Sequence, residues 1–164
     1  MKAFDDKVDD TANVPVNPVT GADTATLNEM IEVLNDGKIF YEEALNDVTP
    51  ALRALFGRMA ERKSDIAREL ALAVKALGDT PATEGTFAGS MRKLYAELRT
   101  KMSSDKNHEY VAQLEEFEDR ILHTFEAAVA KTDDSTVRRI ADRYFSSVKN
   151  DHDFMRDLKK SDVG

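Results

Sequence analysis

The feature that most constrains this chain is a helical spacing of apolar residues, which is clearest between residues 50 and 78. Apolar side chains recur there at intervals of three and four and line one face of a helix: Leu52, Leu55, Phe56, Met59, Ile66, Leu70, Val74 and Leu77. Thr49 is a favourable N-cap, and Pro50 suits the first helical position. Gly78 stands where a left-handed C-cap is wanted. The pattern predicts a helix that begins at Pro50 and ends just before Gly78.

Similar stripes predict helices over residues 26–47, 105–131 and from the turn at 133–135 to about Lys159. Thr26 and Glu29 have the spacing of a capping box, which predicts that the first helix begins at Thr26. A shorter helix is predicted over 86–101, with Phe87 facing inward. Residues 48–50 alone separate the first two helices, and so short a connection makes them antiparallel neighbours.

Each long helix is amphipathic and cannot bury its apolar stripe alone, so the four are expected to pack together. The sequence therefore predicts an all-α protein: a four-helix bundle of two antiparallel helix pairs joined by a shorter helical crossover. We assign residues 24–160 to the bundle and residues 1–23 to a flexible acidic arm. The arm carries Asp5, Asp6, Asp9 and Asp10. An alternative is that it docks on a neighbouring subunit.

Composition excludes several classes of function. The chain of 164 residues has no cysteine, which removes disulfides and thiolate metal sites, and its net charge is −8. A chain with this negative charge repels phosphate groups. We therefore expect neither nucleic acid nor an anionic membrane as a partner. No segment has the ~20 continuous apolar residues of a membrane span. We expect a cytoplasmic protein. No phosphate-binding loop or nucleophile motif is present, and we expect no enzymatic activity.

Polar residues on the apolar stripes mark where a bundle would place a site. Lys38 lies within the apolar stripe of the first predicted helix, and Lys63 lies within that of the second. Glu118 is at the edge of the stripe over 105–131, and Asp151 and His152 interrupt the stripe of the last helix. We expect a salt-bridge layer in which Glu118 and His152 face the two lysines. Such a layer costs desolvation but fixes the packing of the helices.

An alternative is a metal site. Di-iron bundles use a Glu from two helices and a Glu-x-x-His from each of the other two. Here the residue three positions after Glu61 is Ser64, where the motif needs a histidine. The residue three positions before His152 is Lys149, where the motif needs a glutamate. No cofactor is therefore expected, with iron or manganese held by Glu42, Glu118 and His152 as the alternative. A third reading places these side chains on the surface.

The chain also resembles a known family, over about residues 26–158. The likeness rests on Leu27 to Glu32, Asp36-Gly37, Tyr41 and Ala44, on Pro50, Leu52, Leu55-Phe56, Ala60-Glu61-Arg62 and Glu69-Leu70, and on Gly78, Pro81, Gly85 to Gly89, Glu116 and Glu118-Asp119. These residues resemble the bacterial DUF2383 family. The resemblance implies a ferritin-like bundle with no assigned activity, and a link to stress responses.

Together these observations predict a non-enzymatic bundle that acts through self-association, as a homo-oligomer, or through a protein partner. Phe145 and Leu122, on the shoulders of their stripes, are expected to supply the contact surface. The alternatives are a degenerate ferritin-like protein that binds iron or manganese, and a binder of small molecules between the helices.

Overall fold

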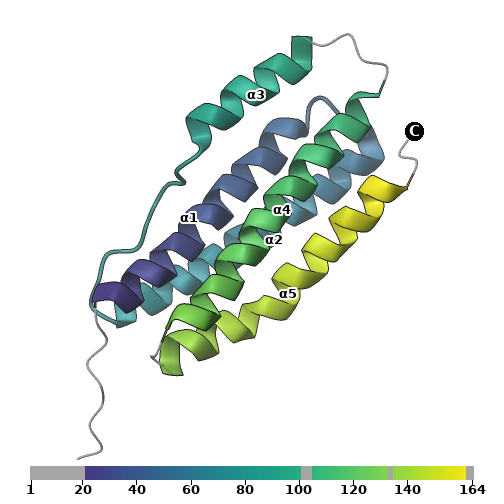
Figure 1. Ribbon diagram of the computed structural model, residues 1–164. Helices are drawn as coiled ribbons and strands as arrows, with labels where there is room; N and C mark the ends of the chain where they lie inside the picture. The colour runs from purple at the N-terminus through teal and green to yellow at the C-terminus, as the bar shows by residue number, and fades with distance from the viewer. Residues whose placement is uncertain (1–20, 101–104, 133–134, 162–164) are drawn as a thin grey trace, which may run out of the picture.

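The computed structural model describes residues 21–100, 105–132 and 135–161, which form five helices (Figure 1). These are α1 (Gly21–Ala44), α2 (Pro50–Ala76), α3 (Ala88–Thr100), α4 (Lys106–Lys131) and α5 (Ser135–Lys160). The described residues contain no strand, which confirms the predicted all-α class. The first 20 residues of the predicted arm lie outside the described part.

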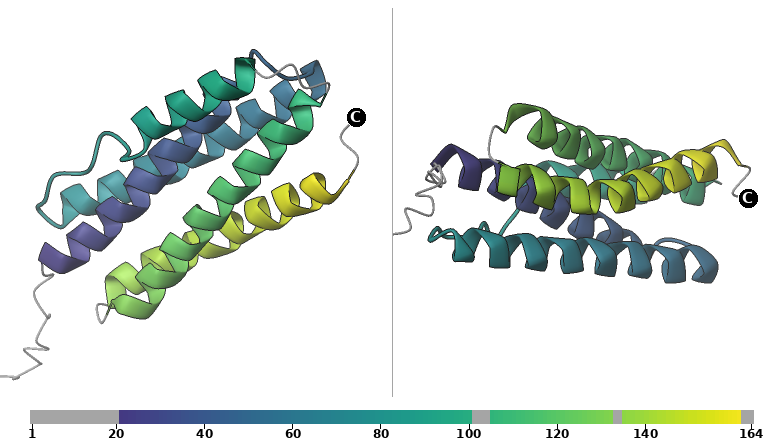
Figure 2. Two further views of the ribbon diagram at one scale, coloured as in Figure 1. Left: turned by 45° about the horizontal axis from the view of Figure 1, so that its top comes forward. Right: turned by 90° about the horizontal axis from the view of Figure 1, so that it is seen from below.

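Four long helices make the bundle, and the short helix α3 belongs to the crossover. α1 packs most extensively on α2 and also on α4, and α4 packs on α5 (Figures 1 and 2). The chain reverses between α1 and α2 and again between α4 and α5, as predicted. The crossover carries the chain back along α1, so that α4 runs antiparallel to α1. None of the described helices is long and apolar enough to cross a membrane.

The ends of α2 follow the sequence signals closely. Thr49 is its N-cap, Pro50 is its first residue, and Gly78 adopts a left-handed φ of 83° just after its C-cap residue, Leu77. The predicted start of α1 was wrong, because the helix begins at Gly21 and not at Thr26. Its first turns are fixed by the loop after α2: the Thr24 hydroxyl donates to Asp79 at 2.5 Å. A tertiary contact therefore extends α1 beyond its local capping signal.

The apolar stripes meet in one core that draws on all five helices. Two predictions about apolar side chains were wrong. Phe87 was expected inside but is 40% exposed, and Leu122 was expected on the contact surface but is buried. Phe145, the other residue predicted for that surface, is half-buried against the core. Phe87 precedes the first turn of α3, so it is not on that helix's inner face.

The crossover is attached to α1 at the start of α3 by one buried carboxylate. Asp36 accepts hydrogen bonds from the backbone N–H groups of Thr86, at 3.0 Å, and Phe87, at 3.2 Å. Gly85 lies directly against this carboxylate, where a Cβ atom would collide with it. These contacts explain a glycine at position 85 without any special backbone angle.

The end of α3 is attached by a second acidic residue, Asp47, which lies in the turn after α1. Asp47 accepts from the Arg99 guanidinium at 2.8 Å and from the Tyr110 hydroxyl at 2.7 Å. Tyr95, in the middle of α3, donates to the backbone carbonyl of Phe40 at 2.9 Å. The crossover helix is thus held to α1 at both ends and once between them.

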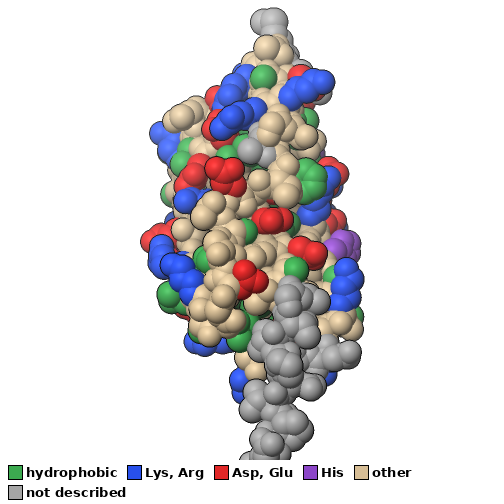
Figure 3. Space-filling view, turned by 90° about the vertical axis from the view of Figure 1, so that its left-hand side faces the viewer, with side chains coloured by type: hydrophobic (Ala, Val, Ile, Leu, Met, Phe, Trp, Pro, Cys, Tyr) green, Lys and Arg blue, Asp and Glu red, His purple; other side chains and the backbone are tan. Residues whose placement is uncertain are grey.

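The surface shows no broad field of one sign on the face in Figure 3. Acidic and basic side chains are interspersed there, and hydrophobic side chains appear only in small patches. The net charge of −8 is therefore distributed and does not form one acidic face on that side.

A matched pair of glycine substitutions tests the attachment of the crossover. Gly85→Ala forces the new methyl group into the Asp36 carboxylate and should destabilise the protein by about 1–3 kcal/mol. Gly57→Ala, inside α2, meets no atom within 4 Å and should stabilise by up to about 1 kcal/mol through helix propensity. Urea unfolding measures both, and equal effects of the two substitutions would contradict the assignment.

Candidate functional site

A cluster of charged side chains lies in the centre of the bundle, and each long helix contributes to it. Lys63 comes from α2, Glu118 from α4, Asp151 from α5 and Tyr41 from α1. The Lys63 ammonium lies 2.5 Å from Glu118 Oε1 and 3.6 Å from Asp151 Oδ2. The Tyr41 hydroxyl donates to the same Glu118 oxygen at 2.6 Å. We call these four residues the central cluster.

The central cluster is closed to water. The side chains of Lys63 and Glu118 are 2% and 1% exposed, and Asp151 is buried. Arg62 closes the cluster from the surface, because its guanidinium lies 2.8 Å from Asp151 Oδ1. Two carboxylates therefore meet two cations, and the charges of the cluster balance within the fold.

Burial changes the proton affinities of two members. Burial raises the pKa of Asp151, and the nearby Lys63 ammonium opposes that rise only in part. Burial and the neighbouring Glu118 carboxylate hold the pKa of Tyr41 well above its ordinary value. Tyr41 is therefore a neutral hydrogen-bond donor, and its ring also faces the Lys63 ammonium at 5.0 Å.

Gly37 makes room for the stem of Lys63. A Cβ atom at position 37 would lie 3.2 Å from Lys63 Cδ and 2.9 Å from Ile121 Cδ1. The glycine in α1 thus lets the lysine chain cross the core beside the helix backbone. Its helix-propensity cost of about 1 kcal/mol is offset by the packing that it permits.

The central cluster does not fit a metal ion. A bundle metal centre needs carboxylate and imidazole ligands with their lone pairs free, but the Lys63 ammonium already lies against Glu118 and near Asp151. One carboxylate oxygen, Glu118 Oε2, is buried without a hydrogen-bond partner in the described structure. No histidine contacts the cluster through any hydrogen bond or ion pair of the described residues. The lysine occupies the place that a cation cofactor would take.

The salt-bridge prediction was right for Lys63 and Glu118 and wrong for Lys38. Lys38 is 38% exposed and pairs at 3.8 Å with Glu42, which is itself 48% exposed, on the outside of α1. Gly37 faces the core, and the next residue, Lys38, is turned toward the solvent side of α1. The Lys38 ammonium therefore reaches water. His152 also has a partner other than the lysines.

The three residues predicted as metal ligands lie in different surroundings. Glu42 is on the surface with Lys38, Glu118 is in the central cluster, and His152 pairs with Asp119. Among the described residues, the His/Cys/Asp/Glu group with ligand atoms within 4.8 Å of one another is instead Glu115, Asp119 and His152.

This second group lies between α4 and α5 and is half-buried. His152 Nε2 is 2.5 Å from Asp119 Oδ1, and Nδ1 is 3.0 Å from Asp153. Burial lowers the pKa of His152, but the hydrogen bonds to Asp153 and Asp119 outweigh it and hold that pKa above its ordinary value. Lys159 pairs with Glu115 at 3.1 Å. We call Glu115, Asp119 and His152 the α4–α5 cluster.

The sequence did not predict the roles of Tyr41 in the central cluster, of Arg62 beside it, or of Glu115 and Asp119 in the α4–α5 cluster. Glu115 and Asp119 are four residues apart on one helix face, and this spacing was a usable signal. The sequence did not indicate that this face of α4 lies against His152. The rotation of α5 relative to α4 is set by packing and not by local sequence.

A family model for a domain of unknown function, DUF2383, matches residues 23–131. The chain belongs to the DUF2383 family. The matched stretch holds Tyr41, Lys63 and Glu118 of the central cluster, and it ends before α5 with Asp151 and His152. No curated protein matches the chain.

A double-mutant cycle tests the buried ion pair. Lys63→Met leaves Glu118 buried without its cation and should destabilise by about 3–5 kcal/mol. Glu118→Gln keeps an acceptor for the Tyr41 hydroxyl, so adding it to Lys63→Met should recover part of the loss, with a coupling of about 2 kcal/mol.

Chemical denaturation measures all members of the cycle. Lys93→Met, on the exposed face of α3, is the control and should change stability by less than about 0.5 kcal/mol. Additive effects of the two core substitutions would show that the pair is not coupled.

Proposed function

We propose that this DUF2383 protein acts without catalysis, as a helical bundle that associates with itself or with a protein partner. The observation that carries the proposal is the central cluster, in which Lys63 and Tyr41 pair with Glu118 and Arg62 pairs with Asp151. A site of this kind has no open position for a substrate or a metal. The polar interior then serves to fix the helix packing, and function falls to the surface.

Exposed apolar side chains on three elements support the surface role. Leu72 on α2, Phe87 before α3 and Phe154 on α5 are large and exposed. Single exposed apolar residues are common, so the proposal rests on the closed interior together with these residues. We also propose a ferritin-like relationship and a link to stress responses, both from the family resemblance, and a cytoplasmic location, from the sequence.

Metal analysis and light scattering on the untagged, dialysed protein test this proposal together. We expect less than one metal ion per chain and a mass of at least twice the 18.3 kDa of one chain. Leu72→Gln or Phe154→Gln should weaken the association, whereas Arg58→Gln, which changes an exposed polar side chain of α2, should not. A monomer at every concentration, without a binding partner, would contradict the proposal.

A second candidate function is iron or manganese binding, and the geometry of the α4–α5 cluster favours it. An imidazole and two carboxylates converge there within 4.8 Å, and both ligand types bind these metals. This site differs from the predicted set, since it uses His152 with Glu115 and Asp119. A bound metal would have to displace Lys159 from Glu115 and a proton from His152.

Titration with Mn²⁺ at two pH values tests the second candidate. Because the pKa of His152 is raised, binding should weaken as the pH falls and protons compete for the imidazole. His152→Ala should abolish stoichiometric binding, and His123→Ala should leave it unchanged. Binding that survives His152→Ala, or that is independent of pH, would exclude this site.

A further inference from the structure

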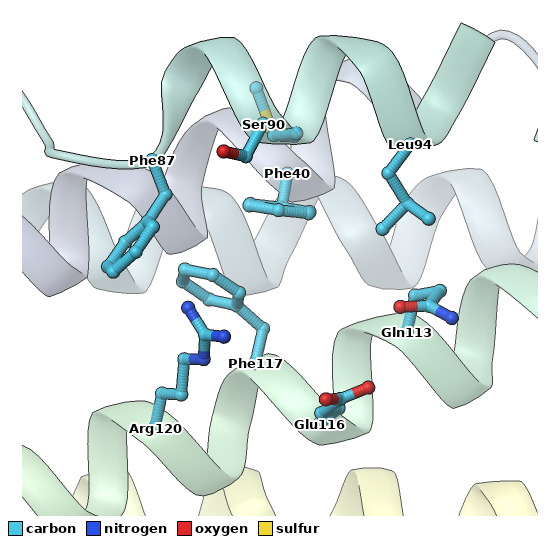
Figure 4. A pocket seen from close by; sticks show the side chains of 9 residues that line it. Phe40, Phe87, Ser90, Leu94, Gln113, Glu116, Phe117 and Arg120 are labelled. Carbon is cyan, nitrogen blue, oxygen red and sulfur yellow. The ribbon is translucent and has the colours of Figure 1, made fainter. Parts of the chain in front are cut away.

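A groove lies between α3 and α4, on the face of the bundle where the crossover passes. Its volume is about 270 Å³ and its floor is the stacked pair Phe40 and Phe117, whose ring centroids are 4.3 Å apart (Figure 4). Met91 and Leu94 of α3 form one wall. The two attachments of α3 lie at Asp36 and Asp47, so the groove opens between them. A space of this size accepts one aromatic or large aliphatic side chain.

Two charged residues of α4 flank the floor on opposite sides of Phe117. The Arg120 guanidinium lies 4.7 Å from the centroid of the Phe87 ring and 5.8 Å from that of Phe117, at one end of the groove (Figure 4). Glu116 lies on the other side of Phe117. Within the part of the chain that the structure describes, neither Arg120 nor Glu116 is in an ion pair. The groove therefore presents an apolar centre between an unpaired cation and an unpaired anion.

The Arg120 end of the groove faces the start of α1. A second hollow continues from Arg120 and Phe87 toward Glu29 and Glu32, which lie in the first half of α1. Moving from the groove toward residue 21, the surface charges therefore follow in the order Glu116, Arg120, then Glu29 and Glu32.

We propose that the chain's own residues 1–20 bind in this groove, with Phe4 on the Phe40–Phe117 floor. The sequence around Phe4 carries the complementary charges in the matching order. Lys2 precedes Phe4, Asp5 and Asp6 follow it, and Lys7 comes next. With Phe4 in the groove, Lys2 faces Glu116, Asp5 and Asp6 face Arg120, and Lys7 faces Glu29 and Glu32.

The connection to α1 permits this placement within one chain. Along α1, the helix rise of about 1.5 Å per residue puts Phe40 about 28 Å from Gly21. The 17 residues from Phe4 to Gly21 span at most about 60 Å, and a flexible chain of that length has a typical end-to-end distance of roughly 20–25 Å. Because a tether of this length gives an effective concentration near the millimolar range, the groove of the same chain is favoured over that of a second copy. The inference does not depend on the proposed self-association.

A spin label on the full chain tests the contact. The protein has no cysteine, so Ala3→Cys gives one site for a nitroxide. We expect the label to broaden the amide signals of Ser90–Leu94 and Gln113–Phe117, and to leave those around Asp65 on the outer face of α2 unchanged. The broadening should occur in a chain that carries both the label and ¹⁵N, and not in a mixture of labelled chains with separate ¹⁵N chains.

Matched variants separate docking from random proximity. Phe4→Ala should remove most of the broadening, whereas Val8→Ala, on the same segment, should retain it. Arg120→Glu should weaken it and Arg139→Glu on α5 should not. Changing Asp5 and Asp6 to Lys in the Arg120→Glu background should restore it.

Three results would overturn the proposal: no broadening at the groove, broadening that Phe4→Ala leaves unchanged, or broadening seen only between chains. The last result would assign the segment to a second copy. Light scattering on the same samples reports self-association separately, so either proposal can fail while the other stands.

Discussion

The buried ion pair between Lys63 and Glu118 is the interaction on which the rest of the interior depends. An ammonium and a carboxylate that are this deeply buried are tolerated only when each is paired and hydrogen-bonded. That requirement fixes several neighbours. Tyr41 must donate to Glu118, Gly37 must leave space for the lysine stem, and Asp151 must approach from α5. A misrotated helix would leave a charge unpaired, so the pair selects one packing of four helices.

The charged side chains around Lys63 also connect α2 to α5. α2 and α5 pack on each other much less than α1 on α2 or α4 on α5. Asp151 of α5 accepts from Arg62 and lies near Lys63, both on α2. These polar contacts supply a specific attachment where the apolar contact is thin. They also bring in α5, which lies outside the stretch matched by the family model.

Much of the fold follows from local rules, and the parts that do not have identifiable causes. The stripe, Thr49-Pro50 and Gly78 were enough to define α2, because each acts within its own helix. The start of α1 was not predictable, because Thr24 is held by Asp79 from a distant loop. Lys63 was placed correctly by its position on a stripe, but Lys38, with an equally regular spacing, reaches water beside Glu42. Helical spacing predicts only roughly which way a side chain points around the helix axis. A long lysine side chain at the border of the apolar stripe can therefore extend its ammonium into solvent. The α4–α5 cluster was missed because it depends on the relative rotation of two helices.

We infer that the Lys63 ammonium supplies, from within the chain, the positive charge that a metal ion supplies in an iron-binding bundle. Anomalous diffraction from crystals grown with Mn²⁺ tests it most directly. We expect electron density for the Lys63 amine against Glu118 and no anomalous peak between Glu118 and Asp151. A peak between those two carboxylates, with Lys63 turned out to solvent, would contradict it.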